Sequence, residues 1–111
     1  MLNFDLERDE QGGSALVSVR GDFDLQVAER VTNELIEVES RGPELLVIDL
    51  SDLSFLDSSG MGVIAAAQGR ATEAGRRLVV VKPPAGVRSA FQLSGLEDVL
   101  EMADDVASVY P

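Results

Sequence analysis

The sequence contains no cysteine and no histidine. Without cysteine, the chain can form neither a disulfide nor a thiolate site. Without histidine, it cannot build a Ser-His-Asp or Cys-His catalytic arrangement or a zinc site based on imidazole. It also has no Gly-x-Ser-x-Gly pattern of a serine hydrolase and no Gly-Lys-Ser/Thr of a P-loop. We therefore expect no enzymatic activity, no metal and no cofactor.

Basic residues are few, with 9 Lys and Arg against 20 Asp and Glu, which gives a net charge of −11. The acids are spread over many short clusters. Such a chain would repel phosphates, so we expect no direct binding to nucleic acid or to a membrane. A partner with a basic face fits this charge, although solubility alone would also explain it.

No apolar run approaches the length of a membrane span. The first ten residues, "MLNFDLERDE", are acidic and do not have the pattern of a signal peptide. A chain of 111 residues, 45% of them hydrophobic, suits one folded domain over residues 1–111. We expect a cytoplasmic location.

Strand patterns occur in both halves of the chain. The segment "ALVSVR" alternates, with Val17 and Val19 on one face and Ser18 on the other, which predicts a half-exposed strand. A glycine pair before it predicts a turn from an earlier strand at about residues 2–6. Two later runs, at 45–50 and 78–81, are almost continuously aliphatic, as in parallel strands covered by helices. Side chains expected to be buried in these two runs are Ile48, Leu50 and Val80.

A helical period begins at Asp24, which can cap the helix, and ends at the Gly-Pro pair 42–43. A second helix is predicted from about residue 59 to 74, between the two aliphatic runs, which makes them adjacent parallel strands. Shorter helices are predicted near 87–93 and 106–110. The result is a small α/β domain with a mixed sheet.

Several acids lie at or near the carboxyl ends of the predicted strands, where α/β sheets place ligand sites. They are Asp22, Asp24, Asp49, Asp52 and Asp57. A phospho-accepting receiver domain would also place an aspartate there, and "LLVIDLSDL" and "VVVKPP" echo its acceptor strand and its Lys-Pro. However, no acidic pair follows the first strand to bind magnesium, and one strand–helix unit is missing.

The stretch "DLSFLDSSGMG" places Ser58 at the start of a predicted helix. Unpaired N–H groups and the helix dipole would favour a phosphate there. Gly60 and Gly62 would let another protein approach the backbone closely. In the alternative interpretation, Asp57 or Ser58 is only the N-cap, and the glycines serve packing against the sheet.

The segment "VIDLSDLSFLDSSGMGVI", with "GDFD" before it and "RRLVVVKPP" and "AFQLSGL" after it, resembles the anti-sigma factor antagonists. These are stand-alone bacterial STAS (sulfate transporter and anti-sigma antagonist) domains, and the resemblance runs from about residue 15 to 100. It implies a STAS-type α/β fold: a small mixed sheet with helices packed mainly on one face.

The resemblance also implies a function. In the family, the serine after the aspartate, here Ser58, is phosphorylated by a serine kinase that is also the anti-sigma factor. The unphosphorylated antagonist binds this kinase and frees a sigma factor, as in stress response or sporulation. The phosphorylated antagonist is released, and a PP2C-type phosphatase then restores its unphosphorylated form. Partner-binding residues implied or inferred around this site are Asp24, Asp57, Ser58, Ser59, Gly60 and Met61.

Met61 stands where the family often has leucine. We expect its side chain to be an exposed apolar anchor for the partner; in the alternative, it points into the core. The alternative function is a non-switching STAS module of a sensory scaffold or a transporter accessory protein.

Overall fold

One mixed sheet runs through the computed structural model, which describes residues 3–110. Its strands in this range are β1 (Phe4–Gln11), β2 (Ser14–Phe23), β3 (Leu45–Asp49), β4 (Leu53–Leu56), β5 (Arg77–Val81) and β6 (Glu101–Ala103). Their order is β1-β2-β3-β5-β6, and β4 pairs with β2. The β1–β2 pair is antiparallel and every other pairing is parallel.

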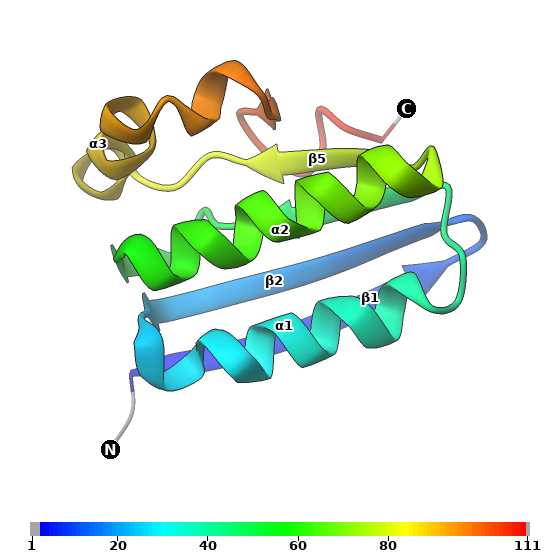
Figure 1. Ribbon diagram of the computed structural model, residues 1–111, viewed down its shortest axis with the longest axis horizontal. Helices are drawn as coiled ribbons and strands as arrows, with labels where there is room; N and C mark the ends of the chain where they lie inside the picture. Colours follow the sequence, from blue (N-terminus) through cyan, green and yellow to red (C-terminus); the bar gives the residue numbers. More distant parts are fainter. Residues whose placement is uncertain (1–2, 111) are drawn as a thin grey trace.

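The two long helices, α1 (Leu25–Glu39) and α2 (Ser58–Ala74), lie side by side along one face of the sheet (Figure 1). The shorter α3 (Ala85–Ser94) and a 3₁₀ turn, η1 (Leu96–Asp98), lead to β6. Within residues 3–110, no helix has the length and apolar character needed to cross a membrane. The predicted α/β fold, a mixed sheet with helices mainly on one face, is confirmed.

The two aliphatic runs form the centre of the sheet, as predicted. Strands β3 and β5 are parallel neighbours, with Ile48 opposite Val80, and α2 connects β4 to β5. The side chains of Ile48, Leu50 and Val80 are all 0% exposed. Continuous aliphatic strands arise here because helices cover one face and the C-terminal segment covers part of the other.

Helix α1 follows the predicted period, and its buried residues are Val27, Val31, Leu35 and Val38. It starts after Asp24, whose carboxylate accepts a hydrogen bond from the N–H of Gln26 at 3.0 Å. The chain leaves the helix through Ser40 and turns at Gly42, which has a φ of 70°. A positive φ of this kind favours glycine, which suits Gly42 to the turn that follows the helix.

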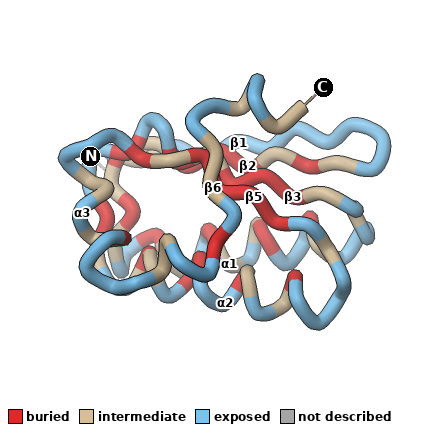
Figure 2. Tube along the Cα trace, turned by 90° about the horizontal axis from the view of Figure 1, so that it is seen from above, coloured by how far each residue is buried: buried red, intermediate tan, exposed pale blue. Residues whose placement is uncertain are grey.

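The first two strands are longer than predicted. The earlier strand, expected at 2–6, runs from Phe4 to Gln11, and Leu2 lies outside the described residues. Ser18 was expected on an open face but is only 6% exposed. The segment that follows β6 lies on the sheet face opposite α1 and α2 (Figure 2). Val106 and Tyr110 from that segment line a small cavity over β2.

The helix predicted at residues 106–110 is wrong. The chain forms β6 and then only bends and turns. The N–H of Lys82 donates to the carbonyl of Ala103 at 2.9 Å, and the Lys82 ammonium pairs with Asp104 at 3.0 Å. Strand pairing and this ion pair hold the segment beside β5. Strand β4 was not predicted either.

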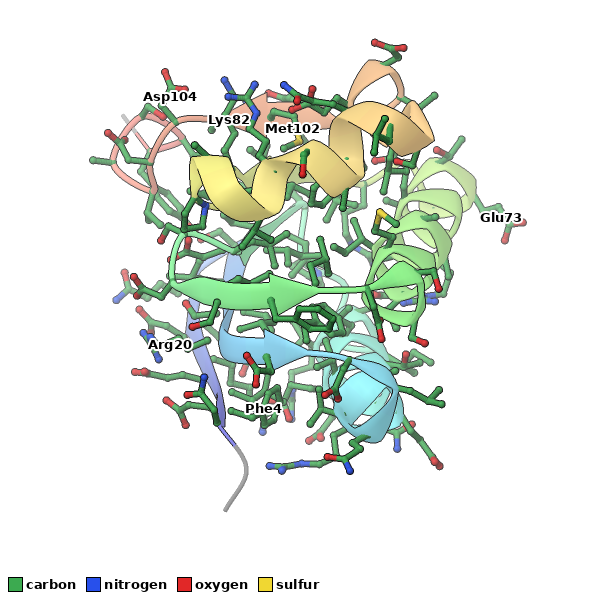
Figure 3. All side chains as sticks on the ribbon, turned by 90° about the vertical axis from the view of Figure 1, so that its left-hand side faces the viewer. Phe4, Arg20, Glu73, Lys82, Met102 and Asp104 are labelled. Atoms are coloured by element: carbon green, nitrogen blue, oxygen red, sulfur yellow. The ribbon has the colours of Figure 1, made fainter. Side chains whose placement is uncertain are left out.

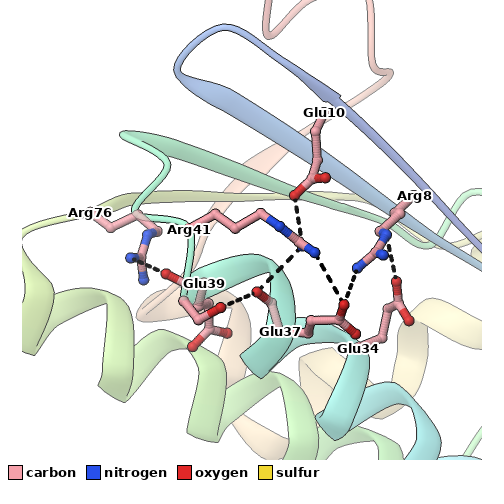
Figure 4. Close-up of polar contacts among 8 residues, drawn as sticks. Arg8, Glu10, Glu34, Glu37, Glu39, Arg41 and Arg76 are labelled. Carbon is pink, nitrogen blue, oxygen red and sulfur yellow. Dashed lines mark hydrogen bonds and ion pairs between the residues drawn. The ribbon is translucent and has the colours of Figure 1, made fainter.

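The carboxyl-terminal ends of α1 and α2 are joined to their surroundings by arginines. Arg8 of β1 pairs with Glu34 and Glu37 of α1, and Arg41 pairs with Glu37 as well (Figure 4). Across the two helices, Arg70 donates two hydrogen bonds to Glu39, at 2.6 and 3.0 Å. The Glu39 side chain is only 9% exposed, so this bidentate pair is shielded from solvent. These contacts fix the end of the helix layer that lies away from the candidate site.

Candidate functional site

The starts of α1 and α2 meet at one edge of the sheet. Phe23, the last residue of β2, pairs with Leu56, the last residue of the parallel strand β4. Asp24 and Asp57 follow these two residues and cap the two helices. Because paired strands lie about 4.8 Å apart, the two caps are neighbours. Figure 3 looks onto this edge, where β2 and β4 point toward the starts of the two helices.

Asp57 closes the start of α2 with hydrogen bonds. Its carboxylate accepts from the N–H of Ser59 at 2.9 Å and from the N–H of Gly60 at 3.1 Å. Its own N–H donates to the carbonyl of Phe23 at 3.3 Å, which ties the cap to β2. The expectation that Asp57 or Ser58 is the N-cap is therefore met by Asp57, and the capping leaves open whether Ser58 is also a site for phosphate. The expectation of unpaired N–H groups beside Ser58 is wrong for Ser59 and Gly60.

Ser58 is the first residue of α2, and its side chain is exposed, whereas Ser59 is half-buried. At 100° per residue, Ser58 lies about 160° around the helix from buried Gly60. Its hydroxyl is therefore on the solvent side of the helix start. This arrangement leaves Ser58 open to another protein and restricts access to Ser59.

The two glycines of the motif play different roles. Gly60 is buried, and a Cβ atom on it would lie 2.5 Å from a Leu56 methyl carbon and 2.9 Å from the Phe23 carbonyl oxygen. Gly60 therefore serves packing of α2 on the strand ends and is not available for contact with a partner, contrary to our expectation. Gly62 is exposed, and a Cβ atom there would meet nothing within 4 Å. The backbone of α2 is open to close approach at Gly62.

Met61 is half-buried and packs against the core, which agrees better with the alternative of a core-facing side chain than with the exposed anchor that we expected. A better apolar candidate, not predicted from the sequence, is Leu25, whose side chain is 75% exposed beside the Asp24 cap. Leu25 lies about 200° around α1 from buried Val27. Its position outside the periodic apolar stripe of α1 was the signal that would have identified it.

The electrostatic surroundings of the site are acidic. None of the ion pairs among the described residues involves Asp24 or Asp57. Each of the nine Lys and Arg side chains is engaged by another part of the chain: eight contact carboxylates or backbone carbonyls, and Arg30 lies over the ring of Phe4 at 5.0 Å. In the part of the chain that the structure describes, no three His, Cys, Asp or Glu side chains are grouped to hold a metal ion.

Comparison with known proteins identifies the family. The family model described as "Mlab, STAS domain" matches residues 6–102. The anti-sigma F factor antagonist of Paenibacillus polymyxa is 29% identical over 107 residues, which cover 94% of this chain and 90% of that protein.

Solved structures agree with this assignment. An anti-sigma factor antagonist from Mycobacterium paratuberculosis has a TM-score of 0.84 at 27% identity, covering 95% of this chain and 89% of that chain. The fold is shared with the Bacillus cell fate determinant SpoIIAA. Its unphosphorylated form has a TM-score of 0.77 at 23% identity, with 96% and 92% coverage, and its phosphorylated form has 0.71 at 22%, with 96% of both chains covered. The chain is a STAS domain and belongs to the anti-sigma factor antagonist family.

Proposed function

We propose that the unphosphorylated protein binds a serine kinase that is also an anti-sigma factor, and thereby releases a sigma factor. Phosphorylation of Ser58 by that kinase dissociates the complex, and a PP2C-type phosphatase restores the unphosphorylated protein, which binds again. In this scheme the protein acts by binding and catalyses nothing itself.

The observation that carries the proposal is the position of Ser58. It is an exposed hydroxyl at the start of α2, next to a capping aspartate, in a chain of the anti-sigma factor antagonist family. SpoIIAA, which has the same fold, has structures in both the unphosphorylated and the phosphorylated form. A phosphate is therefore compatible with this fold, which supports a switch that acts on binding without unfolding the domain.

The surface around Ser58 suits a protein partner with a basic face. Exposed Leu25 supplies an apolar side chain, and Gly62 offers open backbone on α2. Asp24 and Asp57 add carboxylates that no described Lys or Arg neutralises through an ion pair. Apolar contact would contribute affinity, and the carboxylates would steer a basic surface toward the site.

Phosphorylation would change this surface strongly. A phosphate on Ser58 adds a charge of about −1.5 to −2. It would lie near Asp24 and Asp57, and a partner fitted to a hydroxyl would have to desolvate it. The fold should change little because Ser58 is exposed and contributes nothing to the core. Affinity should fall because the added charge and bulk lie in the contact surface.

Purification of the tagged protein from its native host, followed by identification of the bound protein, tests the partner. Incubation of that partner with ATP and the Ser58→Ala and Ser59→Ala variants then tests the modified residue by mass spectrometry. We expect a serine kinase that phosphorylates the wild type and Ser59→Ala but leaves Ser58→Ala unmodified. A phosphate on Ser59 would overturn the assignment of Ser58, and a bound scaffold or transporter in place of a kinase would favour the alternative STAS function.

A further inference from the structure

We propose that Asp57 is a positioning residue that keeps a phosphate on Ser58 away from the backbone donors of α2. The inference rests on the proposed phosphorylation of Ser58 and adds a role for its neighbour. It predicts that the phosphate projects into solvent without a backbone or arginine partner, where it obstructs a docking protein.

The first support is the use of the helix donors. A phosphate at the start of a helix is normally stabilised by free N–H groups of the first turn. In this protein the N–H groups of Ser59 and Gly60 already donate to the Asp57 carboxylate. The N–H of Met61 donates to the Asp57 carbonyl at 3.1 Å. A phosphate on Ser58 would have to displace a charged acceptor to gain the donors of Ser59 or Gly60.

The second support is the engagement of the cations. Arginine clusters often hold a phosphoserine in place. Here Arg20 contacts Asp5, Glu7 and Asp52, and Arg88 contacts Glu97 at 2.8 Å. The other Lys and Arg residues are likewise engaged within the chain. An intramolecular clamp for the phosphate would require one of these contacts to be broken.

The carboxylates at the two helix starts would also repel a phosphate on Ser58. Asp57 precedes Ser58, and Asp24 caps the neighbouring helix beside it. Like charges raise the pKa of an acidic group. The second pKa of the phosphate should therefore lie above its ordinary value of about 6.

This arrangement bears on switching. A phosphate folded onto free N–H groups would share its charge with the helix and occupy less of the contact surface. A phosphate kept off the helix by Asp57 keeps its bulk, and a charge that no protein donor shares, where the partner would dock. Asp57 would then set how completely a single phosphate abolishes binding.

The test uses the full chain with phosphoserine installed at position 58 during translation, so no kinase or partner is needed. Phosphorus NMR gives the second pKa of the phosphate, and nitrogen-edited proton NMR follows the amides of Ser59 and Gly60 through the same pH titration. In the wild-type sequence we expect a pKa above about 6 and amide signals that respond little. In the Asp57→Ala variant, both amides should move downfield as the phosphate ionises, and its pKa should fall by about one unit.

Two further variants separate charge from hydrogen bonding. Asp57→Asn keeps a capping oxygen, so the amides should stay unresponsive while the pKa falls by less than in Asp57→Ala. Asp24→Ala removes the matching cap of α1 and should leave the Ser59 and Gly60 amides unresponsive. The proposal is overturned if the amides of the wild-type phosphoprotein respond as fully as those of Asp57→Ala. Because the phosphate is installed directly, this result is independent of whether a kinase modifies Ser58.

Discussion

Replacement of Gly60 by alanine tests how α2 is seated on the strand ends, because this glycine is where the helix lies closest to the sheet. The added Cβ would lie 2.9 Å from the carbonyl oxygen of Phe23 and 3.0 Å from its ring carbon Cγ. That carbonyl accepts a hydrogen bond from Asp57 and belongs to a paired strand, so it cannot move away freely. A Leu56 methyl carbon, 2.5 Å away, would also have to rotate.

The expected magnitude combines two opposing effects. Alanine in place of glycine favours a helix by up to about 1 kcal/mol, whereas overpacking of a core costs about 1–3 kcal/mol. We expect Gly60→Ala to lower the free energy of unfolding by about 1–2 kcal/mol. Gly62→Ala is the matched control, since a Cβ there meets nothing within 4 Å, and it should raise stability by up to about 1 kcal/mol. Urea denaturation of both variants measures the two changes, and a stabilising Gly60→Ala would refute the packing described for the start of α2.

Three other predictions concern the core, an ion pair and the contact surface. Ile48→Ala removes a fully buried side chain from β3 and should cost about 2–5 kcal/mol of unfolding free energy in the same urea assay. Two hydrogen bonds from Arg77 hold the pKa of Glu101 below its usual value. The stability that this pair contributes is therefore complete above the ordinary glutamate pKa of about 4.3, and it is lost as the pH falls through the lowered pKa. The urea midpoint of Arg77→Gln should therefore decline less between pH 5 and pH 3 than that of the wild type, and an equal decline would refute this assignment. Leu25→Ala should weaken partner binding about tenfold, or about 1.4 kcal/mol, without loss of stability, whereas Ile36→Ala, 46% exposed on the same helix, should leave binding unchanged in a calorimetric titration.

The central part of the fold could be predicted because its residues are constrained by burial. Strands β3 and β5 are covered on both faces, which requires continuous aliphatic sequence, and α1 has one buried stripe with a helical period. Strand β4 was missed because it has only four residues and its two middle ones, Ser54 and Phe55, are exposed. Strand β6 has three residues and depends on pairing with β5, so it carries no local signal.

The C-terminal segment shows the limit of periodicity. Val106, Val109 and Tyr110 are spaced as on a helix face, but the segment forms turns, and Val106 and Tyr110 instead line a cavity over β2. Their apolar character serves the second face of the sheet. Tertiary contact of this kind overrides local propensity and cannot be read from the spacing.

At the candidate site, the sequence predicted the start of the helix and the position of Ser58, but not the roles of all its neighbours. The Asp-Ser-Ser-Gly stretch fitted either a cap or a site for phosphate. The structure places Asp57 as the cap through hydrogen bonds within the motif. It also buries Gly60 against Phe23, and this contact depends on the pairing of β2 with the unpredicted β4. A local motif could not supply that contact.

The central claim is that a phosphate on Ser58 prevents partner binding without unfolding the domain. Its most direct test is a calorimetric comparison of the unmodified chain and the chain with phosphoserine at position 58, each titrated with the kinase recovered from the native host. We expect unchanged thermal unfolding, with a dissociation constant raised about a hundredfold, which corresponds to about 2.7 kcal/mol. Equal affinity of the two forms for the kinase, with both folded, would contradict it.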